Sequence, residues 1–237
     1  SFKFCRLFDY KLQYNKTYKH AYSRKSMIGE NITRKEVEAK LAEVGDYVKM
    51  DFLQQCLKKN LDFDTKRFVT VKLSGIYESS NMFLESAKLM RNVADINTTF
   101  EGKYNDFSKS MELYIKAAEF DEADLSFKKA QACGNERQKL ALRLKIKEIY
   151  KTRAKEMLTK DKRKNAADIY EQLLTFPFLD AMERKEAQKS LLQLYQKLGK
   201  IREFYALQKD IDNPQPVKVQ VKEKPKYNNF NIDDLLG

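Results

Sequence analysis

The sequence contains few of the residues that make tight turns. Its 237 residues include only 7 Gly and 4 Pro. Architectures built from many β-hairpins use both residue types heavily, so a turn-rich β fold is disfavoured. No run of about 18 uninterrupted apolar residues occurs, and the sequence therefore predicts no membrane span.

Residues that carry catalysis or bind metals are also scarce. There is one histidine, His20, and there are three cysteines, Cys5, Cys56 and Cys133, without a Cys-x-x-Cys pair. This set predicts neither a zinc site nor a disulfide framework, and we expect reduced thiols in a cytoplasmic protein. A nuclear location fits the same features in a eukaryotic cell. No Gly-rich phosphate loop is present. We therefore expect a protein that is not an enzyme and uses no cofactor.

What the sequence does contain is helical periodicity, from about residue 34 to residue 210. The clearest stretch places six apolar residues three or four positions apart, which puts them on one face of a helix. These residues are Phe100, Tyr104, Phe107, Met111, Tyr114 and Ala118. Thr33 with Glu36 has the spacing of a capping box, and Asn135 and Asp180 precede further helices. The fold class predicted is all-α.

Three local expectations test this interpretation. The helix after Thr33 is expected to continue to about Asn60. Segment 65–79 combines strand-like and helical spacing, and we predict a helix because its neighbours are helical. Gly134 stands where a left-handed residue is expected to end a helix.

The predicted helices form pairs that begin near residues 65, 99, 136 and 181. Spacings of this size are typical of helical repeats. The sequence therefore predicts a right-handed array of antiparallel helical hairpins, with about ten helices. Residues 1–60 would pack on the array or cap it, residues 61–211 would form the repeats, and the Pro-containing residues 212–237 would be a flexible tail.

The chain resembles tetratricopeptide repeats over about residues 65–210. The resemblance is carried by Leu191-x-x-Leu194-Tyr195-x-x-Leu198-Gly199-Lys200 and by Ala166-x-x-x-Tyr170. It implies a solenoid of helical hairpins with a scaffold role, in which a concave groove binds peptides or proteins. The residues with which such repeats grip a peptide carboxylate have no counterpart here, so the resemblance implies no particular ligand.

The formal net charge of +12 is unevenly distributed. Residues 137–164 hold 12 Lys and Arg against three acidic residues, residues 1–25 hold seven against one, and residues 61–130 sum to −2. Basic residues recur every fourth position and continue into a run of three. We name this set the basic ridge: Lys139, Arg143, Lys147, Lys151, Lys155, Lys162, Arg163 and Lys164.

Three interpretations of the basic ridge stay open at this point. It has the composition of a surface that binds an acidic segment of another protein. It is also typical of a solvated helix face whose long side chains cover apolar neighbours. The third interpretation is an RNA- or DNA-associated protein that uses regions 1–25 and 137–164 to bind phosphates.

Residues 230–236 combine bulky apolar side chains with two carboxylates, as short docking peptides do. We name these residues the docking motif: Phe230, Ile232, Asp233, Asp234, Leu235 and Leu236. The motif is expected to bind another protein, or a basic surface of its own or a neighbouring chain, which would give self-association. The alternative is a chain end without a role. The function predicted is a protein-protein interaction adaptor or scaffold.

Overall fold

The computed structural model describes residues 32–213. The predictions for region 1–25, for residues 214–237 of the tail and for the docking motif lie outside these residues, whereas Asp212, predicted to begin the tail, is helical. Within 32–213 there are ten α-helices and no β-strand, which confirms the all-α prediction for this part of the chain. None of these helices has the length and apolar character needed to cross a membrane.

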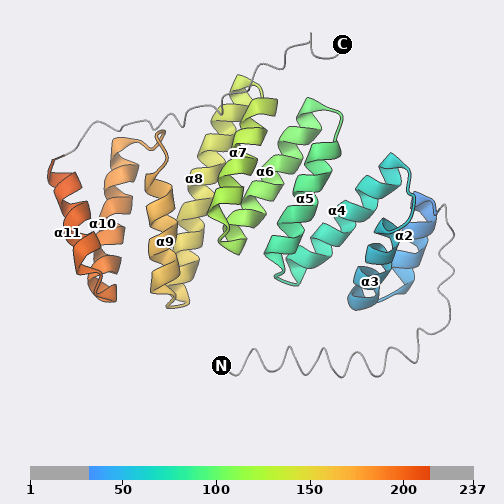
Figure 1. The fold of residues 1–237 in the computed structure, drawn as a ribbon, viewed down its shortest axis with the longest axis horizontal. Helices are drawn as coiled ribbons and strands as arrows, with labels where there is room; N and C mark the ends of the chain where they lie inside the picture. The colour runs from blue at the N-terminus through green and yellow to red at the C-terminus, as the bar shows by residue number, and fades with distance from the viewer. Residues whose placement is uncertain (1–31, 214–237) are drawn as a thin grey trace, which may run out of the picture. The chain divides into compact units, whose positions relative to one another are not determined.

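The described helices belong to two compact units that divide between Gly134 and Asn135. Within each unit, consecutive helices from α3 to α7 and from α8 to α11 pack side by side (Figure 1). The first unit comprises α2 (Arg34–Glu43), α3 (Asp46–Leu57), α4 (Phe63–Ser79), α5 (Phe83–Ile96), α6 (Phe100–Ala117) and α7 (Phe120–Cys133). The second comprises α8 (Glu136–Thr159), α9 (Arg163–Leu174), α10 (Ala181–Leu198) and α11 (Ile201–Asp212).

The first unit begins with two short helices where the sequence predicts one. Val44 and Gly45 are both extended and separate α2 from α3, so the expectation of a continuous helix to about Asn60 is wrong. The spacing of apolar residues can continue across a break between two helices, because it shows which side chains lie on one face and not whether the backbone hydrogen bonds are continuous. Leu53 and Cys56 of α3 share a buried cluster with Val69 and Leu73 of α4. Helix α4 confirms the helical prediction for residues 65–79.

One kind of turn joins the two helices of four pairs: α4–α5, α6–α7, α8–α9 and α10–α11. The residue after each first helix, or one residue later, has a positive φ. These residues are Asn81 at 59°, Ala118 at 64°, Asp161 at 52° and Gly199 at 68°. In each pair the following residue donates its N–H to the carbonyl five positions earlier, at 2.8–3.0 Å. This hydrogen bond is that of a Schellman motif, in which a left-handed residue ends the helix.

Gly134 does not follow this pattern. Its φ of −85° and ψ of 150° are extended, so the expectation of a left-handed residue there is wrong. Asn135 immediately caps α8 through its side chain, which accepts a hydrogen bond from the Gln138 N–H at 2.8 Å. Gly134 and Asn135 therefore join α7 to α8 through two extended residues, without a left-handed one.

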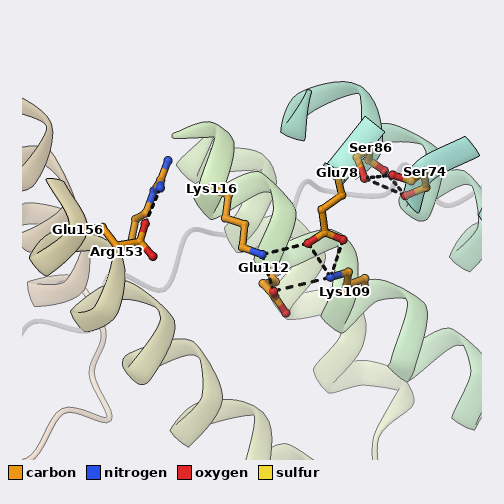
Figure 2. A network of polar contacts seen from close by, with 8 residues as sticks. All are labelled: Ser74, Glu78, Ser86, Lys109, Glu112, Lys116, Arg153 and Glu156. Atoms are coloured by element: carbon orange, nitrogen blue, oxygen red, sulfur yellow. Dashed lines mark hydrogen bonds and ion pairs between the residues drawn. The ribbon is translucent and has the colours of Figure 1, made fainter. Parts of the chain in front are cut away.

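Equivalent positions around these turns hold similar residues. Four positions before the left-handed residue lie large buried side chains, with exposed fractions between 0% and 8%. They are Tyr77, Tyr114, Met157 and Tyr195. Five positions after it, Ser86, Ala123 and Ala166 are fully buried, whereas α11 has the larger Phe204. Small residues let paired helices approach closely: Ser74 of α4 and Ser86 of α5 lie 2.9 Å apart, oxygen to oxygen (Figure 2).

A buried polar network closes the α5–α6 connection. Asn97 donates to Asp106 at 2.8 Å, and Arg67 of α4 reaches the same carboxylate at 3.4 Å. Gly102 lies against this network, because a Cβ at that position would come within 2.3–2.7 Å of the Asn97 side chain. Contacts that short do not occur in proteins, so the sequence needs glycine here.

Candidate functional site

Ion pairs connect alternate helices in the first unit. Glu78 of α4 accepts hydrogen bonds from Lys109 and Lys116 of α6, both at 3.0 Å (Figure 2). Glu112, on α6 itself, lies 2.9 Å from Lys116 and 3.7 Å from Lys109. Burial alone would raise the pKa of Glu78, but the two lysines outweigh it and lower that pKa. Two carboxylates thus balance two ammonium groups.

The second unit has a corresponding contact between α8 and α10. Glu183 of α10 binds Lys147 at 2.6 Å and Lys151 at 2.8 Å, both from α8. Burial opposes ionisation of Glu183, but the hydrogen bonds from both lysines prevail and lower its pKa to about 2. The Glu183 side chain also accepts the Asp180 N–H at 3.3 Å, completing the capping box at the start of α10. One carboxylate here faces two ammonium groups.

The structure separates the basic ridge into residues with partners inside the chain and residues without. Besides Lys147 and Lys151, three more have partners. Lys139 pairs with Glu136 at 2.7 Å, Arg143 lies 5.8 Å above the Phe178 ring, and Arg163 lies 2.9 Å from Asp161. Lys155, Lys162 and Lys164 are exposed and have no ion pair within the described residues. We name these three residues the cationic tip, because they lie near the turn between α8 and α9.

The start of α9 is electrostatically unfavourable. The first turn of α9 contains no acidic residue, and Lys162, Arg163 and Lys164 occupy the N-cap and the first two helical positions. A helix N-terminus carries partial positive charge, so cations there cost about 0.3–1 kcal/mol each at exposed positions. An acidic partner at the cationic tip would offset this cost.

A second exposed surface, besides the cationic tip, lies on helix α11 and consists of large apolar side chains. Its Ile201 and Tyr205 side chains are 65% and 66% exposed, and none of its residues is buried. By contrast, α10 buries Ala187, Leu191 and Leu194 against its neighbours. The amphipathic face of α11 is therefore only partly covered by the described residues.

Cysteine and metal chemistry add no further site to the described region. Cys56 is buried, and burial raises the pKa of its thiol. Cys133 is partly buried and free. No group of three or more His, Cys, Asp or Glu side chains in residues 32–213 is arranged to hold a metal ion.

Sequence reasoning missed the partners of the ridge. A spacing of four residues shows that Lys147 and Lys151 share a helix face, but it does not show which residue faces them. Glu183 lies 36 and 32 residues further along the chain. The sequence did contain a signal for this contact. Helices α8 and α10 are the first helices of consecutive pairs and so are expected to be neighbours, and the capping box of Asp180 and Glu183 places Glu183 at the start of α10.

The chain was compared with known proteins. No protein-family model matches it, and no curated protein is significantly similar to it.

Proposed function

We propose that this chain is a non-enzymatic helical-repeat scaffold, of the tetratricopeptide-like solenoid type, that binds an acidic segment of another protein. The recurrence of one turn carries the proposal. Four helix pairs end their first helix with a left-handed residue and the same backbone hydrogen bond. A supersecondary unit that recurs in this way is the sequence and structural basis of repeat proteins, whose extended surfaces serve binding.

Contacts between alternate helices support the same proposal. Ion pairs link α4 with α6 and α8 with α10, and Asp95 of α5 lies 2.9 Å from Lys129 of α7. In a stack of hairpins, the first helices of successive pairs lie along one face and the second helices along the other. Contacts between a helix and the next but one, such as these ion pairs, are therefore expected in a stack of hairpins.

The cationic tip is the surface we assign to the partner. The side chains of its three lysines have neither an ion pair nor a hydrogen bond within the described residues, whereas five other ridge residues have side-chain partners. Carboxylates of a partner would gain the interaction with these cations and with the N-terminus of α9.

The experiment measures binding of a fluorescent oligo-glutamate peptide to the full chain by anisotropy. The variant Lys155→Glu/Lys162→Glu/Lys164→Glu should bind about tenfold more weakly or worse, because three attractive charges become repulsive. The matched control is Lys185→Glu/Lys189→Glu/Lys197→Glu, which changes the net charge equally at exposed positions of α10. It should change affinity by less than about threefold.

Two outcomes would contradict the proposal. Equal losses in the two variants would mean that overall charge, and not the cationic tip, attracts the peptide. A single-stranded oligonucleotide that binds more tightly than the peptide, with a steep loss of affinity in salt and with sensitivity to the tip variant, would favour the nucleic-acid function.

A further inference from the structure

Helix α11 presents an apolar strip that the described residues leave uncovered. Ile201 and Tyr205 are separated by one helical turn and lie on one side of the helix. We name these two residues the α11 strip; about two thirds of each side chain is exposed. The half-buried side chains of Phe204, Leu207 and Ile211 form the side that packs against α10.

The strip has a cationic border. Arg202 precedes Tyr205 by three residues and Lys209 follows it by four, so both border Tyr205 on the helix surface. Both are exposed and have no ion pair within residues 32–213. Glu203 and Asp210 lie on the opposite side of the helix, and Asp212 follows Tyr205 by seven residues, so it lies on the face of the strip about two turns further along. The surface therefore combines exposed apolar area with two cations along one edge.

The docking motif has the complementary chemistry. It carries four bulky apolar residues, and Asp233 and Asp234 lie between Ile232 and Leu235. A partner that brings apolar area and carboxylates together would satisfy both parts of the α11 surface. A second copy of α11 would instead bring the same two cations to the same surface, so charge complementarity favours the motif over self-pairing of α11.

The motif can also reach the strip. Residues 214–229 separate Asn213, the residue that ends α11, from Phe230. Sixteen extended residues span at most about 55 Å, whereas a helix of twelve residues is about 18 Å long. A tether of this kind gives effective concentrations in the millimolar range, so even a weak contact is occupied.

We propose that the α11 strip binds the docking motif of this chain. Phe230, Ile232, Leu235 and Leu236 supply the apolar side chains that cover Ile201 and Tyr205. Asp233 and Asp234 lie beside Arg202 and Lys209.

The test uses a fluorescent peptide with the sequence of residues 228–237 and the full chain as receptor. A chain with Leu235→Ala/Leu236→Ala has a disabled motif, so its α11 strip is free. It should bind the peptide at least about tenfold more tightly than the unmodified chain, whose tethered motif competes. Adding Ile201→Ser/Tyr205→Ser to that chain should abolish binding. Adding Met182→Ser, at a residue 84% exposed near the start of α10, should leave binding unchanged.

Other results overturn the proposal. Undetectable peptide binding to the Leu235→Ala/Leu236→Ala chain would refute it, as would binding that survives the serine substitutions. Sedimentation tests the second copy as occupant: a dimer lost in Ile201→Ser/Tyr205→Ser but kept in Leu235→Ala/Leu236→Ala would identify α11 self-pairing. If the serine variant melts at a lower temperature, Arg202→Glu/Lys209→Glu serves as the second variant and should weaken peptide binding without loss of apolar area.

Discussion

The same kind of contact is balanced in one unit and unbalanced in the other. Between α4 and α6, Glu78 and Glu112 face Lys109 and Lys116. Between α8 and α10, Glu183 is the one carboxylate among the described residues within ion-pair distance of Lys147 and Lys151, and Glu148 and Glu186 act on Lys151 from further away. The comparison shows that part of the basic charge in residues 137–164 stabilises the second unit itself. The lysines of the cationic tip form no ion pair within the described residues and so do not stabilise the second unit in this way.

The largest effect expected belongs to the core of the first unit. Tyr114 is fully buried on α6, as its apolar periodicity predicts. Tyr114→Ala should destabilise that unit by about 3–5 kcal/mol, because an aromatic side chain leaves a cavity. Hydrogen exchange of the full chain should show faster exchange in α4–α7 and unchanged exchange in α10. A change below about 0.5 kcal/mol would mean that α6 does not pack as described.

The second prediction tests the unbalanced contact. Glu183→Gln should destabilise the second unit by on the order of 2 kcal/mol, because it removes the carboxylate that forms ion pairs with two largely buried ammonium groups. Glutamine can still accept the Asp180 N–H, so the capping box is kept. Glu78→Gln is the matched change in the first unit and should cost less, since Glu112 still neutralises Lys109 and Lys116. Chemical denaturation of both variants measures the difference.

The pH dependence of that contact has a definite sign. The pKa of Glu183 falls from 4.5 to about 2 on folding. A lowered pKa means that the stabilisation is fully present above pH of about 4.5 and is lost as the pH falls toward 2. The difference in stability between the unmodified chain and Glu183→Gln should therefore shrink across this window. A constant difference would show that the carboxylate charge is not what stabilises the contact.

The third prediction compares equivalent tyrosines. The Tyr195 hydroxyl donates to Glu171 of α9 at 2.9 Å, and the Tyr77 hydroxyl accepts from Gln54 of α3. The buried Tyr114 hydroxyl has no hydrogen-bond partner within the described residues. At the position on α5 equivalent to Gln54 and Glu171, Arg91 lies over the Tyr114 ring and pairs with Glu122.

Removing the hydroxyls should therefore have different consequences. Tyr195→Phe should cost on the order of 1.5 kcal/mol, the usual size for a hydrogen bond to a charged group. Tyr114→Phe should be neutral or slightly stabilising, because the unmodified protein already bears the cost of an unsatisfied polar group. Thermal melts of the two variants give the comparison. A similar loss in both would show that Tyr114 has a partner in solution, such as a buried water.

Some features of this structure could be predicted from the sequence and others could not. Helix starts were predictable where a side chain caps them, as at Asn135 and Asp180, since the cap and its partner are three residues apart. Partners at a distance of more than 30 residues, such as Glu183 for Lys147, were not, because spacing on one helix carries no information about the next. A left-handed helix end was predicted from a glycine, and at Gly134 that prediction is wrong. Ala118 does adopt the left-handed conformation, and no glycine marks the position in the sequence.

That turn gives the smallest expected effect and tests whether the four pairs are equivalent. Ala118 has φ 64° and is exposed, whereas the corresponding residue of the α10–α11 turn is Gly199 with φ 68°. A Cβ in the left-handed region costs roughly 1 kcal/mol, and glycine avoids this cost at the expense of greater freedom in the unfolded chain. Ala118→Gly should therefore stabilise the first unit by about 0.5 kcal/mol, and Gly199→Ala should destabilise the second by about 1 kcal/mol. Differential scanning calorimetry of the two variants measures both signs. If Ala118→Gly destabilised the protein, the left-handed conformation of Ala118 would not be strained. The four turns would then be equivalent only in their backbone hydrogen bonds.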